Sequence, residues 1–235
     1  MKKLSVIIPC YNEHKTVAAL ISKVANAKIP LQEKEIIAID DCSTDGTWQI
    51  LQGIKDKGLS NVTFKLQKHQ KNAGKGCAIR TGISLASGDI MIIQDADMEY
   101  NPDEYAKIIS PIVEGRADVV YGTRFPQRLG INNFSIHLFG NKMLTLMSNI
   151  FSGLRLTDME TCYKAFRAEI IKGLYLESNR FGFEPEVTAK ISKLKVRITE
   201  VPISYAGRKY SDGKKIGFKD AVDTAWCILK YNLFN

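Results

Sequence analysis

Short apolar runs alternate with segments of helical spacing through the first half of the chain, and this alternation limits the folds open to it. The runs at residues 4–8, 35–39, 90–93 and 119–121 have the length of buried strands, and residues 62–66 alternate as a strand does. Strands that are separated by helices pair in parallel, and both faces of such a sheet are covered. We therefore predict an α/β fold with a mostly parallel central sheet and helices on both faces.

Length and composition favour one domain with an anionic partner. The 235 residues are 45% hydrophobic, which is enough for one sizeable core, and no linker divides them. We expect a single domain over residues 1–235. The formal net charge of +8 predicts a nucleotide, a phosphate, a nucleic acid or an acidic membrane surface as partner, without choosing among them.

Cysteine usage and hydropathy bear on where the protein works. The five cysteines are odd in number and form no C-x-x-C pair, which fits free thiols in a reducing cytoplasm. The apolar run before Pro9 is too short for a signal peptide, and no stretch has the roughly 18 uncharged apolar residues of a membrane-spanning helix. We expect a cytoplasmic protein whose contact with a membrane, if any, is peripheral.

Acidic and polar residues follow the ends of four predicted strands. These segments are residues 9–13, 40–46, 94–99 and 122–124. Ligands of open α/β sheets bind beyond the carboxyl ends of the strands, which parallel strands bring to one edge. The sequence therefore predicts a polar site at this edge.

The segment Asp95-Ala96-Asp97 is the strongest candidate for a metal site. Its two carboxylates directly follow a predicted buried strand, and Glu99 offers a third oxygen ligand. Mg²⁺ and Mn²⁺ take oxygen ligands and share them with substrate phosphates. A metal here would neutralise charge on a departing diphosphate. Alone, an Asp-x-Asp is also common in surface loops.

Three further segments allow both a structural and a functional interpretation. Asp45 is expected to cap the helix that follows, whereas Asp41 could accept hydrogen bonds from a base or a ribose. Residues 72–76 lack the pattern of a Walker A loop, but their glycines would let the backbone approach a ligand. Residues 208–215 are either a solvated charge run or a flexible clamp on a diphosphate.

The second half of the chain carries two apolar stripes at helical spacing. One falls in the segment 128–155, which is rich in Phe, Leu and Met, and the other in an amphipathic helix at residues 217–235. By default such stripes face the core. The alternative is that the first segment holds the lipid tail of an acceptor and that the second lies in a membrane interface.

Taken together, these segments resemble the family 2 glycosyltransferases with a GT-A fold. The similarity is greatest to the polyprenyl-phosphate branch, which includes dolichyl-phosphate mannose and glucose synthases. It rests on residues 5–13, 40–47, 72–76, 95–97, 122–125, 158–164, 181–186 and 211–214. Each motif is modest, but their order and spacing are specific and span nearly the whole chain.

The resemblance implies a role for each matching residue. The nucleotide-sugar would be held by Pro9, Tyr11, Glu13, Asp41, Lys75, Asp95, Asp97, Arg208 and Lys214. The metal, Mg²⁺ or Mn²⁺, would be bound by Asp95, Asp97 and Glu99. The acceptor would meet Arg124 and Lys142, and Asp97, Arg124 and Asp158 would form the catalytic set. Similar enzymes invert the anomeric centre by direct displacement of the nucleotide.

The nature of the acceptor decides what Asp158 has to do. A phosphomonoester has a second pKa of roughly 6 and is already anionic at neutral pH, so it needs orientation and charge screening rather than a base. Asp158 would then orient the acceptor or stabilise positive charge at the sugar carbon. An alcohol acceptor would need a general base, for which Asp158 is the first candidate and Glu160 the second.

The sequence departs from the family pattern in two places, and alternative functions remain open. Many relatives continue into membrane-spanning helices, whereas this sequence ends at Asn235, and Lys142 stands where an arginine would be expected. The same transferase chemistry on a soluble or glycan acceptor, and a non-catalytic nucleotide-sugar-binding module, are the alternatives. No recognition motif supports a nucleic-acid binder. The segment around Asp158 favours a UDP-sugar over GDP-mannose only slightly.

Overall fold

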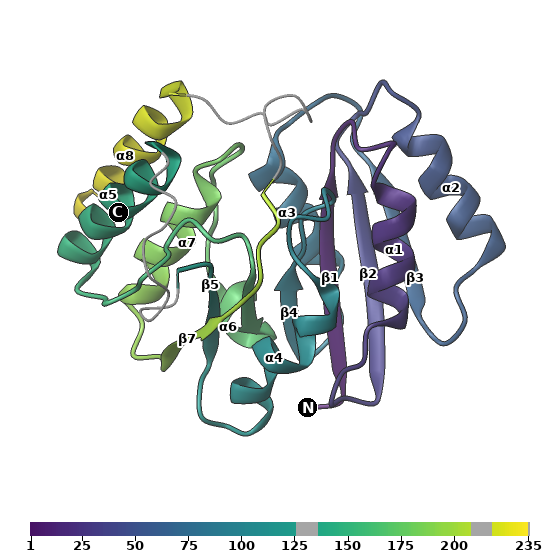
Figure 1. Cartoon of the computed structure of the whole chain (residues 1–235), viewed down its shortest axis with the longest axis horizontal. Helices are drawn as coiled ribbons and strands as arrows, with labels where there is room; N and C mark the ends of the chain where they lie inside the picture. The colour runs from purple at the N-terminus through teal and green to yellow at the C-terminus, as the bar shows by residue number, and fades with distance from the viewer. Residues whose placement is uncertain (126–135, 208–217, 235) are drawn as a thin grey trace.

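A seven-stranded mixed sheet forms the centre of the protein (Figure 1). The structure, a computed structural model, describes residues 1–125, 136–207 and 218–234. Its strands are β1 (Lys3–Cys10), β2 (Glu33–Asp40), β3 (Thr63–Lys68), β4 (Ile90–Ile93), β5 (Val119–Thr123), β6 (Lys164–Arg167) and β7 (Ile198–Pro202). They lie in the order β3-β2-β1-β4-β6-β5-β7. All neighbours pair in parallel except β6, which is antiparallel to both β4 and β5.

Helices cover both faces of this sheet, as the alternating pattern predicts. They are α1 (Val17–Asn26), α2 (Thr47–Lys57), α3 (Lys75–Leu85), α4 (Tyr105–Val113), α5 (Ile136–Ser152), α6 (Ala168–Gly173), α7 (Phe183–Ser192) and α8 (Phe218–Leu233), with a 3₁₀ turn at Pro102–Glu104. In Figure 1, α1 and α4 lie in front of the sheet and α3 lies behind it. The α/β prediction is confirmed.

The core is built where the sequence is most apolar. All four residues of β4 are buried, and so are seven of the eight residues of β2. Burying one large apolar side chain contributes about 1.5–3 kcal/mol, so these central strands hold the sheet together. Helix α3 packs tightly on β1, because a Cβ at Gly82 would clash with Ile7. The central strands therefore give the polar edge a rigid support.

Helices α5 and α8 carry their apolar stripes on the outside, which corrects the default expectation that these stripes face the core. The two helices pack against each other and against α7 at one end of the sheet (Figure 1). Their inward faces include the small polar residues Thr145, Ser148 and Thr224, which let the helices approach closely. The exposed residues, called here the outer apolar stripes, are Phe139, Met143, Leu146, Ile150 and Phe151 of α5 and Val222, Trp226 and Leu233 of α8.

Two features bear on membrane and redox predictions. Among the described residues, none of the helices has the length and apolarity needed to cross a bilayer. All five cysteines are free thiols, as their number and spacing predict.

Candidate active site

The loops that follow β1 and β2 are fastened together at the carboxyl edge of the sheet. The backbone N–H of Asn12 donates to Ser43 Oγ over 3.0 Å, and Asn12 Oδ1 accepts from the backbone N–H of Thr44 over 2.9 Å. The backbone N–H of Glu13 donates to Thr47 Oγ1 over 2.8 Å. Asn12 has a φ of 55°, in the left-handed region that asparagine tolerates. The two loops thus form one continuous rim.

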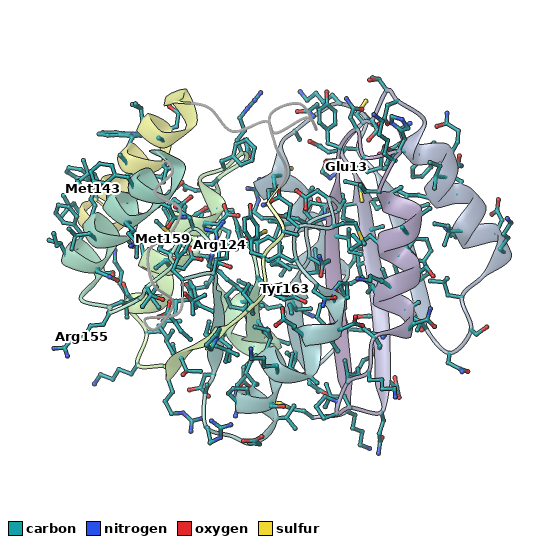
Figure 2. All side chains as sticks on the ribbon, viewed as in Figure 1. Glu13, Arg124, Met143, Arg155, Met159 and Tyr163 are labelled. Atoms are coloured by element: carbon teal, nitrogen blue, oxygen red, sulfur yellow. The ribbon has the colours of Figure 1, made fainter. Side chains whose placement is uncertain are left out.

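Three of the predicted donor-binding residues lie on this rim. Pro9 is near the carboxyl end of β1, opposite Ile39 of β2. Tyr11 is 37% exposed, which leaves its ring accessible for stacking on a base. Glu13 accepts a hydrogen bond from Thr16 Oγ1 over 3.1 Å and lies at the upper edge of the sheet in Figure 2.

The carboxylate of Asp41 is hydrogen-bonded to other groups of the protein. Its carboxylate accepts from the backbone N–H of Ala73 (2.9 Å) and of Gly74 (2.7 Å), and it pairs with His69 Nδ1 (2.7 Å). Gly74 has a φ of 94°, which a residue with a side chain rarely adopts. In this structure Asp41 therefore shapes the glycine loop that precedes α3.

The N-cap of α2 is Gly46, and Asp45, which the sequence predicts as the cap, bonds the helix from one residue earlier. Its Oδ1 accepts from the backbone N–H of Thr47, the first residue of α2, over 3.0 Å. Burial alone would raise the pKa of Asp45, but hydrogen bonds from Thr47 and His14 lower it well below its usual value. This carboxylate therefore stays ionised at the helix N-terminus.

The carboxylates after β4 are held by different partners. Asp95 Oδ1 pairs with Lys75 Nζ at 2.9 Å and with the Cys162 thiol at 3.0 Å. Asp97 Oδ1 accepts from the backbone N–H of Glu99 over 3.1 Å, and Glu99 Oε2 accepts from the Tyr205 hydroxyl over 2.6 Å. No three His, Cys, Asp or Glu side chains of the described residues are gathered as a metal-binding group.

Asp95 and Asp97 nevertheless suit a hard divalent cation. Both carboxylates offer oxygen ligands, and Lys75, which pairs with Asp95 at 2.9 Å, would have to turn away before a cation binds there. Mg²⁺ commonly takes one or two protein carboxylates and completes its shell with substrate phosphates and waters. Two carboxylates without a third ligand therefore fit a metal that arrives together with a diphosphate.

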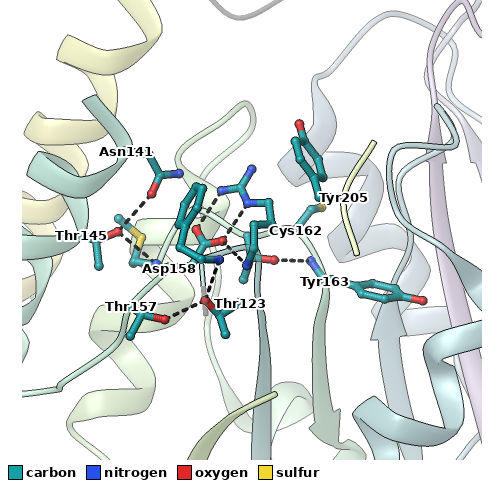
Figure 3. A network of polar contacts seen from close by, with 12 residues as sticks. Thr123, Asn141, Thr145, Thr157, Asp158, Cys162, Tyr163 and Tyr205 are labelled. Carbon is teal, nitrogen blue, oxygen red and sulfur yellow. Dashed lines mark hydrogen bonds and ion pairs between the residues drawn. The ribbon is translucent and has the colours of Figure 1, made fainter. Parts of the chain in front are cut away.

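Arg124 and Asp158 form a buried ion pair at the carboxyl end of β5 (Figure 3). Arg124 Nε donates to Asp158 Oδ2 over 2.7 Å and Nη2 donates to Oδ1 over 2.8 Å, while the backbone N–H of Arg124 donates to Oδ2 over 3.1 Å. The guanidinium also lies over the Tyr205 ring, 5.1 Å from its centroid. Asp158 thus orients Arg124 with the two-pronged geometry that fixes a guanidinium plane.

The aspartates that follow β4 and the partly buried arginine that follows β5 thus lie at the carboxyl edge of the sheet. Residues 5–174 match the model of the family described as glycosyl transferase family 2. The chain belongs to glycosyl transferase family 2. As a member of this family it is a glycosyltransferase, and the resemblance found in the sequence is confirmed.

Curated relatives of this glycosyltransferase include three proteins from archaea and bacteria. A dolichol-phosphate mannosyltransferase of Pyrococcus furiosus is 29% identical over 92% of this chain and 60% of its own length. An undecaprenyl-phosphate 4-deoxy-4-formamido-L-arabinose transferase of Yersinia enterocolitica is 28% identical over 91% and 63%. A UDP-N-acetylglucosamine–dolichyl-phosphate N-acetylglucosaminyltransferase of Methanococcus voltae is 29% identical over 93% of both chains. The chain thus spans less than two thirds of the first two relatives.

Solved structures share the fold. Glucosyl-3-phosphoglycerate synthase of Mycobacterium tuberculosis, in complex with Mn²⁺, UDP and phosphoglyceric acid, gives a TM-score of 0.72 at 17% identity over 100% of this chain and 80% of that one. S. aureus TarS in complex with UDP gives 0.62 at 20% identity over 100% and 67%. At these identities the likeness establishes the GT-A fold alone.

Several contacts of this glycosyltransferase were not predicted from the sequence. Glu184, in the first turn of α7, pairs with Lys75 Nζ at 3.2 Å. Lys164 is fully buried and donates from Nζ to the Met159 carbonyl over 2.9 Å. A lysine within the apolar run of β6 and an acidic first turn in α7 were the signals available. Glu184 and Lys75 are far apart along the chain, whereas Met159 lies only five residues before Lys164, and neither pairing has a recognisable sequence pattern.

The remaining predicted residues are less closely tied to the site. Lys142 lies on an exposed part of α5. Arg208 and Lys214 lie outside the described residues, as does the beginning of the segment 128–155. Their predicted roles stay predictions.

Glu160, the second candidate for a base, has an unusual environment. Its Oε1 is buried and has no hydrogen-bond partner among the described residues. Burial and the nearby charge of Glu184 raise the pKa of Glu160 to about 7, against the opposing charges of Lys164 and Arg124. This carboxyl therefore exchanges its proton near neutral pH.

Proposed function

We propose that this glycosyltransferase moves a hexose from a nucleotide-diphospho-sugar, a UDP-sugar or GDP-mannose, to a polyprenyl or dolichyl phosphate, with inversion at the anomeric carbon. The observation that carries the proposal is Arg124, which Asp158 fixes at the edge of the sheet where β4 ends in Asp95 and Asp97. A fixed guanidinium suits a phosphate on the acceptor. Three relatives named for polyprenyl- or dolichyl-phosphate substrates support it.

The donor would lie along the rim formed after β1 and β2. Tyr11 and Glu13 face this rim, and Asp41 would act mainly by holding the glycine loop before α3 in place. Lys75, at the start of α3, would turn its charge to the diphosphate when the donor binds. Arg208 and Lys214 are proposed to close over the same group.

Asp95 and Asp97 would hold the Mg²⁺ or Mn²⁺ ion. When bound, this ion would neutralise the charge that develops on the diphosphate leaving group. Glu99 would join only if the Tyr205 hydroxyl releases it, since the two are hydrogen-bonded at 2.6 Å.

The acceptor phosphate would bind beside Arg124. One of its oxygens attacks the anomeric carbon, a new carbon–oxygen bond forms, and the bond from that carbon to the diphosphate breaks with its electron pair leaving on the nucleotide. Because the phosphate is already anionic, no proton has to be removed. Asp158, with both oxygens bound by Arg124, would serve by orienting the guanidinium.

A peripheral contact with the cytoplasmic face of a membrane would bring the lipid acceptor to the site. The outer apolar stripes expose Trp226 to 60% and Ile150 to 69%, which is unusual for side chains of this size. The net charge of +8 favours an anionic lipid surface. These features support a protein that lies on the bilayer.

Partition of the product tests this proposal. A labelled sugar donor is incubated with a short polyprenyl phosphate, with the matching polyprenol, or with phosphoglyceric acid. We expect label in the organic phase with the lipid phosphate only. Label that stays in the aqueous phase as a new sugar phosphate would favour a soluble phosphate acceptor, and transfer to the polyprenol would favour an alcohol acceptor.

A further inference from the structure

The segment that connects α5 with β6 reaches both sides of the site, and Glu160 lies in its middle. Two residues earlier, Asp158 binds Arg124 on the acceptor side. Two residues later, the thiol of Cys162 lies 3.0 Å from Asp95 on the donor side. Along the chain, Glu160 therefore lies between Asp158 and Cys162, and the charge of Arg124, the group proposed to hold the acceptor, acts on it.

The two carboxyl groups of this segment differ in their partners. Both oxygens of Asp158 accept hydrogen bonds from Arg124. In contrast, Oε1 of Glu160 is buried without a hydrogen-bond partner among the described residues. Buried polar atoms in folded proteins almost always have a partner, and a ligand supplies one where the protein does not. Glu160 is thus the carboxyl that can still form a hydrogen bond with a bound molecule.

The charges that act on Glu160 come from several elements, and Glu160 itself acts on the Cys227 thiol of α8. Glu184 faces it from α7, Lys164 from β6, Arg124 from the end of β5, and Asp158 from its own segment. Burial and Glu184 raise the pKa of Glu160, while Lys164 and Arg124 lower it, and the result is about 7. A second anion arriving here, such as a phosphate, would raise the pKa further.

We propose that Glu160 binds the acceptor phosphate as a neutral carboxylic acid, donating its proton in a hydrogen bond to a phosphate oxygen. This inference rests on the proposed function. An ionised Glu160 would repel a phosphate dianion, whereas the protonated form offers a donor. The proton stays on Glu160 throughout, because the attacking oxygen carries none.

Proton uptake on acceptor binding tests the proposal without relying on turnover. At pH 8 free Glu160 is mostly ionised, so binding of a short polyprenyl phosphate should take up close to one proton. Titration calorimetry in two buffers of different ionisation enthalpy measures this uptake in the wild-type protein. At this pH the phosphate is already a dianion and contributes no uptake of its own. An uptake near zero would contradict the proposal.

The variant Glu160→Gln separates a hydrogen-bond donor from a base. Glutamine keeps a donor and cannot titrate, so we expect KM for the lipid phosphate to rise by about threefold at pH 6.5, the value of one weakened hydrogen bond. In the wild type KM should rise about tenfold between pH 6.5 and 8.5, as ionisation removes the donor, and this rise should vanish in Glu160→Gln. Glu169→Gln, an exposed glutamate of α6, is the matched control.

Two results with Glu160→Gln would overturn the inference. One is a KM that still rises with pH as it does in the wild type. The other is a turnover rate that falls by about 100-fold or more, which would show that Glu160 acts as a base. Thermal melting shows whether Glu160→Gln is folded. If the variant is unfolded, the calorimetry on the wild-type protein tests the inference instead. A wild-type protein that does not bind or use lipid phosphate would instead overturn the proposed function, and this inference with it.

Discussion

Asp158 presents both carboxylate oxygens to Arg124, and this pairing limits the roles open to each residue. A carboxylate bound in this way is poorly placed to take a proton from an acceptor. It is well placed to keep a guanidinium in one orientation. The geometry of this ion pair therefore favours an acceptor that brings its own negative charge.

Replacing Asp158 by asparagine tests the orienting role. Asp158→Asn leaves the shape but removes the charge that holds Arg124, so kcat/KM for the lipid phosphate should fall by about 100-fold, or about 2.7 kcal/mol. Slow hydrolysis of the donor, which needs no acceptor, should fall by less than about threefold. Both rates are measured as nucleotide release.

The matched control for this variant is Asp118→Asn. Asp118, like Asp158, pairs with arginine, here with both Arg167 and Arg197, but it precedes β5 at the opposite end of the strand. Equal losses of transfer and of donor hydrolysis in Asp158→Asn would show that the residue does not act on the acceptor.

Sequence alone places individual site residues at the correct edge but does not show how they pair. The aspartates after β4 and the arginine after β5 are predicted from strand ends, where parallel strands converge. That Asp41 is bound by the loop before Gly74, or that Lys75 bridges Asp95 and Glu184, depends on contacts between distant segments. Such pairings follow from the folded structure and have no local signal.

At the scale of single elements, β1 and β2 are joined at their other end by the buried Glu35. Its carboxylate accepts from Ser5 Oγ and from the backbone N–H of Ser87, both over 2.6 Å, and pairs with Lys65 at 3.0 Å and Lys3 at 3.2 Å. Burial alone would raise the pKa of Glu35, but these hydrogen bonds lower it to about 2.

This lowered pKa predicts a loss of stability in acid. Since the folded-state pKa of Glu35 lies below its ordinary value of 4.5, its contribution is present above about pH 4.5 and is lost as the pH falls toward about 2. Urea unfolding of Glu35→Gln should show a free energy of unfolding about 2 kcal/mol lower at pH 7, and a smaller difference from wild type at pH 3.

Glu33→Gln provides the comparison for the Glu35 variant, because Glu33 begins the same strand and is exposed. It should change the free energy of unfolding by less than about 0.5 kcal/mol at either pH. A Glu35→Gln difference that is as large at pH 3 as at pH 7 would contradict the assigned pKa.

The elements that the sequence predicted are those with a strong local pattern. Strands β1 to β5 follow apolar or alternating runs. Strand β6 and helices α6 and α7 were missed. They are short or polar, and β6 begins with the buried Lys164, a charged residue that an apolar pattern does not place in a buried strand; its ammonium donates to the nearby Met159 carbonyl.

In the molecule as a whole, packing within the protein does not explain why the outer apolar stripes at one end of the sheet are exposed. Figure 2 shows Met143 at this end, pointing away from the sheet. The periodicity of α5 and α8 is predicted correctly from the sequence, but periodicity does not say which side faces inward. Here the packed side holds Thr145, Ser148 and Thr224 together with Ile228 and Tyr231, while the large side chains of the outer apolar stripes are exposed. An apolar environment outside the protein would explain this arrangement.

Charged substitutions in the stripes test the proposed membrane contact. Trp226→Glu and Ile150→Glu should each weaken partition onto anionic vesicles by about tenfold or more, since each removes a large apolar side chain worth about 1.5–3 kcal/mol. Sedimentation with vesicles measures the bound fraction. Deletion of residues 217–235 should abolish it.

Tyr175→Glu is the control for these substitutions, because Tyr175 is 81% exposed but lies outside the stripes. It should leave vesicle binding within about twofold of wild type. If the stripes instead bury a second copy of the chain, Trp226→Glu would turn a dimer into a monomer without changing vesicle binding, and the membrane proposal would be wrong.

Nucleotide release by the wild-type protein is the most direct test of sugar transfer to a lipid phosphate. UDP-glucose, UDP-N-acetylglucosamine and GDP-mannose are each supplied with Mg²⁺, Mn²⁺ or a chelator, with and without a short polyprenyl phosphate. We predict that one of the three donors releases its nucleotide, and that this release requires both the metal and the lipid phosphate. Release that is equally fast without the lipid phosphate, or with the chelator, would contradict it.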